Sequence, residues 1–136
     1  MQLGALEFAT LIVLAINVKT RVSGVPGGDA GELLAEACNL GTPHPPGYPL
    51  FTLLSYSVIQ LGKCINLSPA DSVNLLCCTL GAVAFYFVGS TTKLIVSLSN
   101  TKQTNDKGAV AGVFAGFLFS LSPLTWEYST GTEVSV

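Results

Sequence analysis

Two long apolar stretches limit what this chain can fold into more than any other feature of its 136 residues. They occupy residues 73–98 and 109–124, and the polar run SNTKQTNDK separates them. A helix needs about 20 apolar residues to cross a hydrocarbon core of roughly 30 Å, so both stretches are candidate membrane spans. Only 10% of the residues are charged, against roughly a quarter in typical soluble proteins. We therefore expect an all-α membrane protein.

A third apolar segment, residues 3–18, precedes Lys19 and Arg21 and is slightly short for a span. A cleaved signal peptide is the alternative, but it requires a positively charged start and a small-x-small cleavage site. The segment instead contains Glu7 and ends near Asn17. We favour an uncleaved first helix, which brings the expected total to about three spans.

Glycines recur at four- and eight-residue steps in and next to the two long stretches. Small residues at this spacing line one face of a helix and let helices approach closely in lipid. We interpret them as packing positions. They are Gly81, Gly89, Gly108, Gly112 and Gly116.

The composition changes in residues 23–48, which hold four of the seven prolines and the only histidine. Asp29 is a suitable helix N-cap, and Glu32 three residues later completes a pattern typical of a capping box. The pattern predicts a short helix through Asn39. Gly41 and the prolines that follow it would end this helix.

Residues 48–61 are apolar but too few to cross the membrane, which favours an interfacial or re-entrant helix. Polar residues fall partly on one side of it, as expected of a helix lying in the headgroup plane. These are Thr52, Ser55, Ser57 and Gln60. Residues 23–71 would then form one extramembrane loop with short interfacial helices.

In this arrangement the tail, residues 125–136, shares the side of the loop, and residues 93–107 lie on the opposite side. The positive-inside rule should assign the cytoplasmic side. It does not, because each side carries three Lys or Arg residues near the spans. Charge alone therefore leaves the orientation open.

The acidic pair in the loop indicates possible catalytic chemistry. Asp29 and Glu32 lie at i and i+3 and so share one helix face. A site of low dielectric at a membrane edge raises a carboxylate's affinity for protons, which suits a general base acting on an alcohol. The alternative is a capping box without catalytic duty. His44 lies among three prolines whose rigid backbone favours a ligand contact. The alternative for this lone histidine is a partly exposed loop residue without function.

Several functions are excluded or disfavoured. No basic cluster exists that could neutralise a run of phosphates, so nucleic-acid binding is excluded. The four cysteines lack zinc or redox spacing, and no metal site is predicted. Nucleotide-binding glycine loops are absent. A transporter fragment would carry ionisable residues inside its spans. Glu7 is the candidate for such a residue, and this scarcity makes the transporter interpretation the weakest.

Two sequence blocks carry a family resemblance. Residues 27–54 read GGDAGELLAEACNLGTPHPPGYPLFTLL, and residues 126–134 read WEYSTGTEV. Both resemble the DUF2723 family of multi-span membrane proteins, in particular its protein O-mannosyltransferases that act on IPT domains. The resemblance implies the N-terminal part of a C-type glycosyltransferase (GT-C) fold in the endoplasmic reticulum membrane. It also implies a dolichyl-phosphate mannose donor, luminal protein acceptor domains, no cofactor, and a luminal position for residues 23–71 and the tail.

The resemblance also assigns residues. The family's catalytic acid falls on Asp29, with Glu32 beside it, and His44, Tyr48 and Glu133 fall in blocks expected to bind substrate. Asp29 would take the proton of a Ser or Thr hydroxyl as the oxygen attacks the anomeric carbon.

Because the family continues beyond its second block, residues 1–136 are expected to be a single N-terminal part of a glycosyltransferase domain, inactive alone. The alternatives are a non-catalytic truncated membrane protein and a transporter fragment.

Overall fold

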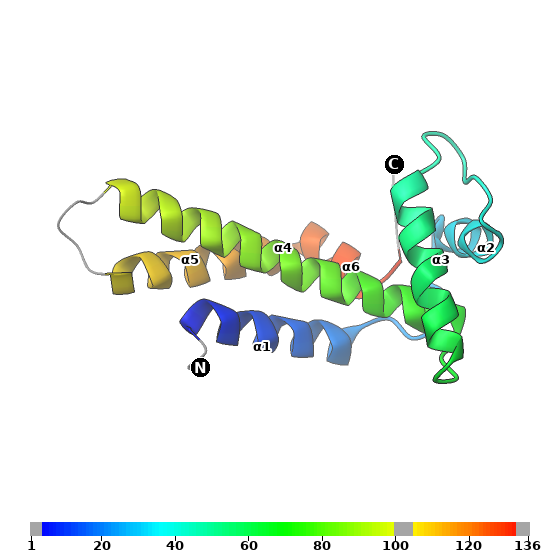
Figure 1. Ribbon diagram of the computed structural model, residues 1–136, viewed down its shortest axis with the longest axis horizontal. Coiled ribbons are helices and arrows are strands. Elements are labelled where there is room, and N and C mark those ends of the chain that lie inside the picture. Colours follow the sequence, from blue (N-terminus) through cyan, green and yellow to red (C-terminus); the bar gives the residue numbers. More distant parts are fainter. Residues whose placement is uncertain (1–3, 100–104, 133–136) are drawn as a thin grey trace.

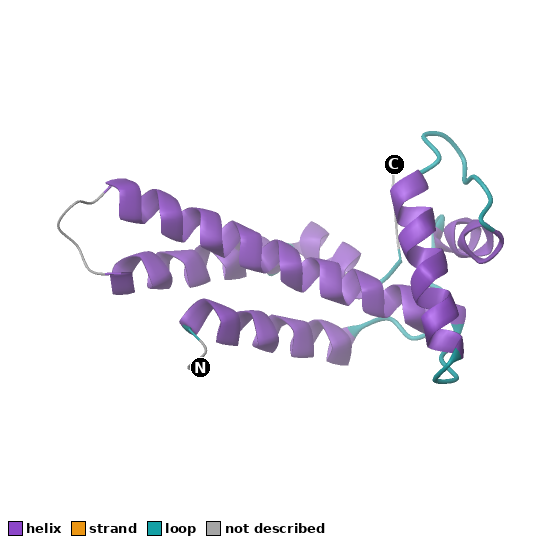
Figure 2. Ribbon diagram, viewed as in Figure 1, coloured by secondary structure: helices purple, strands orange, loops and turns teal. Residues whose placement is uncertain are grey.

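The computed structural model describes residues 4–99 and 105–132, and its regular elements in these ranges are all helices (Figures 1 and 2). This confirms the all-α prediction. In chain order the helices are α1 (Ala5–Thr20), α2 (Ala30–Asn39), α3 (Pro49–Lys63), α4 (Pro69–Ser99), α5 (Asn105–Ser120) and α6 (Pro123–Thr130).

Helices α1, α4 and α5 run along the long axis of the molecule, with α4 antiparallel to the other two (Figure 1). The end of α1, the start of α4 and the short helices α2 and α3 gather at one end of this bundle. The described chain after α6 also returns to that end. The loop that contains Asp29 therefore lies at the same end as the start of the C-terminal tail.

Not all expected spans meet the requirements of a membrane helix. Helix α4 is long and apolar enough to cross a membrane, whereas α1 has 16 residues, fewer than the roughly 20 that a span needs. Residues Lys107–Ser120 of α5 qualify only together with α6, and the bend of 76° between them is that of a broken span or a re-entrant loop. Among the described residues the three spans expected from the sequence thus reduce to one clear candidate, or two with the bent pair.

The bend between α5 and α6 falls in the segment predicted to end the last span. Helix α5 ends at Ser120, and Pro123 opens α6 at a position where proline's missing N–H costs nothing. The polar tail expected from residue 125 onward therefore begins inside a helix. Ser129 and Thr130 of that helix are buried, which the polarity of the tail did not indicate.

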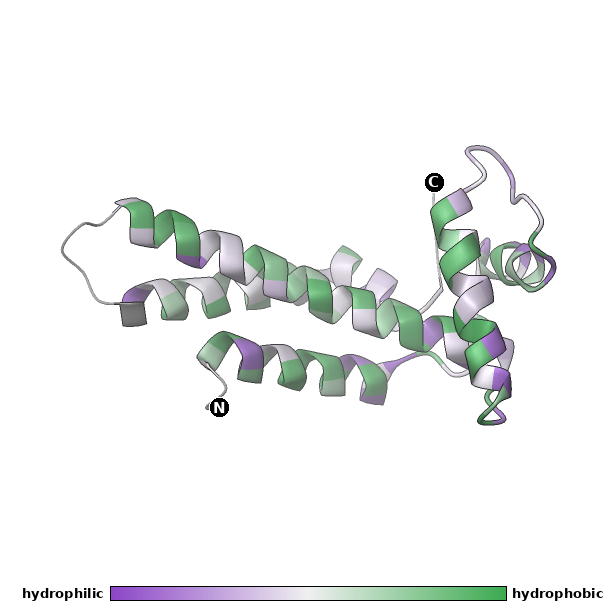
Figure 3. Cartoon of the chain, viewed as in Figure 1, coloured by the Kyte–Doolittle hydropathy of each residue, from purple (hydrophilic) through white to green (hydrophobic). Residues whose placement is uncertain are grey.

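Gly89 of α4 and Gly112 of α5 face each other, as expected of packing positions. A Cβ atom on Gly112 would lie 2.5 Å from the Gly89 carbonyl oxygen, and one on Gly116 would lie 2.7 Å from the Phe85 ring. Neither position has room for a side chain. Phe85 in turn packs with Leu6, Ala9 and Val13 of α1 in a buried apolar cluster. Apolar residues recur along α1, α4 and α5 (Figure 3), and large apolar side chains of the bundle such as Phe87, Leu94 and Phe114 are exposed.

In helix α3, part of the predicted distribution of buried and exposed residues is reversed. Thr52 and Ser55 are buried, whereas Leu50 and Leu61 are exposed. The prediction that the polar side faces headgroups was wrong for Thr52 and Ser55, because that side packs inward next to Ile59. Small side chains there let α3 approach its neighbours, and Ile59 joins a buried cluster that links α2, α3 and α4.

Candidate active site

The site begins at Asp29, the residue before α2. Its backbone angles are helix-like (φ −81°, ψ 0°), and its side chain caps no backbone N–H. A capping side chain normally requires extended angles at the N-cap, so the predicted capping box is wrong. The Asp29 carboxylate is instead free of helix-capping duty, and its negative charge lies at the positive end of the α2 dipole.

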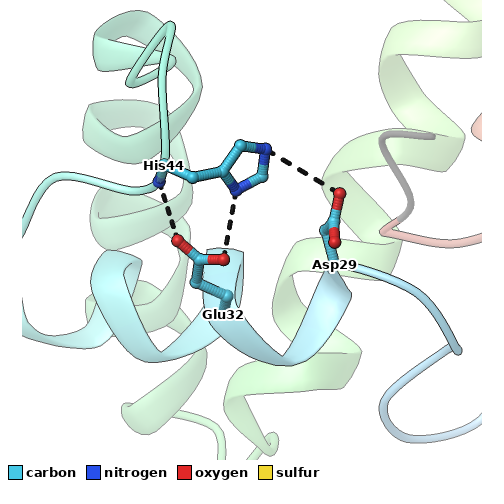
Figure 4. Close-up of polar contacts among 3 residues, drawn as sticks. All are labelled: Asp29, Glu32 and His44. Atoms are coloured by element: carbon cyan, nitrogen blue, oxygen red, sulfur yellow. Dashed lines mark hydrogen bonds and ion pairs between the residues drawn. The ribbon is translucent and has the colours of Figure 1, made fainter. Parts of the chain in front are cut away.

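Glu32 contacts His44 rather than the N-terminus of its own helix. The His44 backbone N–H donates to Glu32 Oε1 over 2.7 Å, and His44 Nδ1 lies 3.1 Å from Oε2 (Figure 4). The two residues are 12 positions apart. This double contact fixes the proline-rich loop against α2 and explains why Glu32 does not complete a capping box.

The loop is shaped so that the His44 ring points back toward α2. Leu40 ends the helix in the left-handed region (φ 52°), and Gly47, also at positive φ, donates its N–H to the His44 carbonyl. The Pro45–Pro46 peptide bond is cis. Pro43 is buried, which anchors the loop one residue before His44.

His44 lies between the two carboxylates. Its Nε2 atom is 3.8 Å from Asp29 Oδ2, on the side of the ring opposite the Glu32 contact (Figure 4). The side chains of His44, Asp29 and Glu32 are 29%, 41% and 46% exposed. An incoming substrate can therefore reach all three side chains.

The contacts with His44 lower the pKa of Glu32. The hydrogen bond from the His44 backbone N–H is the largest cause, followed by the bond with the ring, and both favour the ionised carboxylate. This is opposite to the rise expected for a carboxylate in a low-dielectric site. Glu32 is therefore suited to remain ionised and to hold His44 in place through these two contacts.

Tyr48 completes the group. Its ring meets the His44 ring edge to face, with centroids 5.9 Å apart and planes at 78°. Its backbone is left-handed (φ 39°), and its carbonyl accepts the N–H of Thr52 at the start of α3. The structure thus brings together four of the five residues predicted from the sequence. The fifth, Glu133, lies outside the described residues.

Asn74 is a further polar residue near this end of the molecule, and sequence reasoning missed it. It is fully buried in α4. Its Nδ2 donates to the carbonyls of Val22 and Gly24, and its Oδ1 accepts from the backbone and the hydroxyl of Thr132. An asparagine at the start of an apolar helix was the available signal, since such residues are costly unless they are fully hydrogen-bonded.

Two comparisons relate the chain to known proteins. The family model described as "Protein O-mannosyl-transferase TMEM260 N-terminal domain" matches residues 29–135. The chain is 41% identical over 122 residues to "Protein O-mannosyl-transferase TMEM260" of Mus musculus, covering 90% of this chain and 16% of the mouse protein. It is 35% identical over 115 residues to "Protein O-mannosyl-transferase tmem260" of Dictyostelium discoideum, covering 85% of this chain and 13% of that protein.

The chain therefore spans about a sixth of the mouse protein and about an eighth of the Dictyostelium protein. No solved structure matches it. The matched segment starts at Asp29 and contains Glu32, His44 and Asn74. Because the family model covers most of the chain, the chain belongs to the TMEM260 N-terminal domain family of the protein O-mannosyl-transferases.

Proposed function

We propose that this chain supplies the catalytic acid–base group of a protein O-mannosyltransferase. The full enzyme would transfer mannose from dolichyl-phosphate mannose to Ser or Thr of luminal protein domains. It would be a multi-pass GT-C enzyme of the DUF2723 type in the endoplasmic reticulum membrane. The observation that carries the proposal is the convergence of Asp29, Glu32 and His44 at one end of the helical bundle.

Asp29 is the general base in this proposal. One of its carboxylate oxygens takes the proton of the acceptor hydroxyl. At the same time the hydroxyl oxygen forms a bond to the anomeric carbon of mannose. The bond from that carbon to the phosphate oxygen breaks, and dolichyl phosphate leaves with the bonding electrons, so the configuration inverts. General base catalysis of this kind contributes roughly a hundredfold or more to the rate.

His44 and Glu32 support that base. The Glu32 carboxylate accepts a hydrogen bond and so favours a proton on His44 Nδ1 in the neutral ring. The unprotonated Nε2 then faces Asp29. This atom can receive the proton that Asp29 takes from the acceptor, and the partly exposed ring can then release it to solvent. Both Asp29 and His44 thereby return to their starting forms for the next turnover.

The departing phosphate carries a negative charge that needs a cationic partner. We assign that partner to the remaining length of the full protein, because this chain spans only about a sixth or less of the length of its relatives. For the same reason we expect the isolated chain to show no transfer above background.

A transfer assay in a full-length family member that carries this segment tests the proposal. Radiolabelled dolichyl-phosphate mannose and a luminal acceptor domain are the substrates. Asp29→Asn preserves the size of the side chain and removes its basicity, so we expect turnover to fall about a hundredfold or more with unchanged protein abundance.

Glu36→Gln is the matched control, because Glu36 is a carboxylate of the same helix that lies beside Gly41 rather than His44. It should retain wild-type turnover. Wild-type turnover in Asp29→Asn, or an equal loss in both variants, would remove Asp29 from the role of base.

A further inference from the structure

We propose that Asn74 is a positioning residue that clamps the segment before Asp29 against the segment after α6. The inference rests on the proposed function only for its effect on turnover. Its structural half concerns two pieces of chain, residues 22–24 and 130–132, which lie more than a hundred positions apart in the sequence. Asn74 contacts both pieces at once from inside the apolar helix α4.

The hydrogen bonds of Asn74 use its whole amide. The two Nδ2 protons go to the Val22 and Gly24 carbonyls, at 3.0 Å and 2.9 Å. Oδ1 accepts the Thr132 backbone N–H at 3.0 Å and its hydroxyl at 2.7 Å. An amide has two donors and two acceptor sites, so every one is occupied. Because Asn74 is fully buried, no water can replace a lost partner.

The two segments also contact each other directly beside Asn74. The Val22 backbone N–H donates to the Thr130 carbonyl over 2.8 Å. Gly131 is buried, and a Cβ atom there would lie 3.2 Å from Pro26 Cγ and 3.7 Å from Val22 Cβ. Pro26 precedes Asp29 by three positions. The backbone that leads into the proposed base is therefore held at its start by Asn74 and supported midway by Gly131.

The path from the clamp to Asp29 is short and turns sharply. Gly24 and Gly28 both have positive φ (84° and 63°), which only glycine adopts without strain. These turns fix the direction of the chain once its ends are held. If the Asn74 bonds are lost, the loop start is free to move, and Asp29 moves relative to His44. A misplacement of about 1 Å can cost roughly a hundredfold in rate.

A disulfide can replace the clamp and so provides a sharp test. The 3.7 Å separation of the Cβ positions at residues 22 and 131 falls within the range of about 3.5–4.5 Å found in disulfides. Val22→Cys with Gly131→Cys, in a background with Cys38→Ser and Cys64→Ser, joins the same two segments covalently. Asn74→Leu removes all four hydrogen bonds and keeps the number and branching of the side chain's heavy atoms.

The first readout is the rate of disulfide formation between the two new cysteines in membranes. We expect it to be at least tenfold slower with Asn74→Leu than with Asn74 present. An equal rate would overturn the clamp. If Asn74→Leu does not accumulate, Thr132→Val removes one bond and should give an intermediate rate, with Thr132→Ser as the control that keeps the hydroxyl.

The second readout is mannose transfer by the full-length protein. Asn74→Leu should lower kcat about a hundredfold with little change in the KM for the donor. The oxidised disulfide should restore kcat to within a few-fold, and reduction should abolish that rescue. Full disulfide formation without recovery of kcat would overturn the positioning role. If the wild type itself transfers no mannose, the proposed function fails, and the disulfide rate alone decides the clamp.

Discussion

The helical bundle and the site loop are held together in different ways. In the bundle of α1, α4 and α5, contact depends on missing side chains, because the backbones meet at Gly89 and Gly112. In the site loop, residues 22–48, contact depends on single polar atoms such as Glu32 Oε1 and Asn74 Nδ2. The first kind of contact uses many similar positions, whereas the second uses a few irreplaceable ones.

This difference separates the residues that determine stability from those that determine the geometry of the site. Glycine and apolar contacts in the bundle are non-directional, so a change there should alter the free energy of unfolding rather than the geometry of the site. The contacts of Glu32 with His44 in the loop are partly exposed and add little to stability. They determine instead where Asp29 and His44 lie. Substitutions in the two regions should therefore affect different measurements.

Among the variants that test this contrast between bundle and loop, the largest effect is expected on the kcat of Glu32→Gln in the full-length protein. The amide can no longer act as an anionic acceptor for both the His44 backbone and ring, so the ring loses its fixed direction. We expect kcat to fall roughly ten- to a hundredfold, with only a small decrease in the unfolding temperature. Glu127→Gln, on the exposed side of α6, serves as the control. A large loss of thermal stability together with the loss of activity in Glu32→Gln would mean that the loop is part of the folding core.

The next effect concerns the bundle. Gly112→Ala places a methyl group against the Gly89 carbonyl, which cannot rotate away. Overpacking of this kind costs about 1–3 kcal/mol, so the unfolding temperature in detergent should fall.

The matched control is Gly31→Ala in α2, where a Cβ atom meets nothing within 4 Å. Alanine is the better helix former there and should stabilise the protein by about 0.5–1 kcal/mol. If both variants shift the unfolding temperature in the same direction, the contrast between bundle and loop is wrong.

The same contrast explains what the sequence could predict. Hydropathy located α4 and α5, and the spacing of Gly81, Gly89 and Gly112 indicated packing faces, because these signals repeat within one helix. The short helix after Asp29 also follows from local signals. These features depend on residues three to eight positions apart.

The remaining features depend on contacts across the chain. The predicted capping box was wrong because Glu32 contacts His44, 12 positions away. Asn74 was missed because its hydrogen-bond partners lie 50 to 58 positions away. Helix α6 was overlooked because its polar composition resembles a tail. Its burial depends on the break at Pro123. No local pattern contains this information.

The smallest effect is the pH dependence of the Glu32 contact, measured as the difference in unfolding temperature between wild type and Glu32→Gln. The pKa of Glu32 in the folded protein is lowered below its ordinary value of 4.5 by the His44 hydrogen bonds. A lowered pKa means that the contact stabilises the folded state above the unfolded pKa and that this contribution is lost as the pH falls through the folded pKa.

The difference in unfolding temperature should therefore stay constant from neutral pH to about 5 and close only below 4.5. Because Glu32 is exposed, the difference should be small and should shrink further in high salt. A difference that closes between pH 7 and 6 instead would show that another group, with a higher pKa, controls the loop, and that the Glu32 carboxylate is not what holds His44 in place.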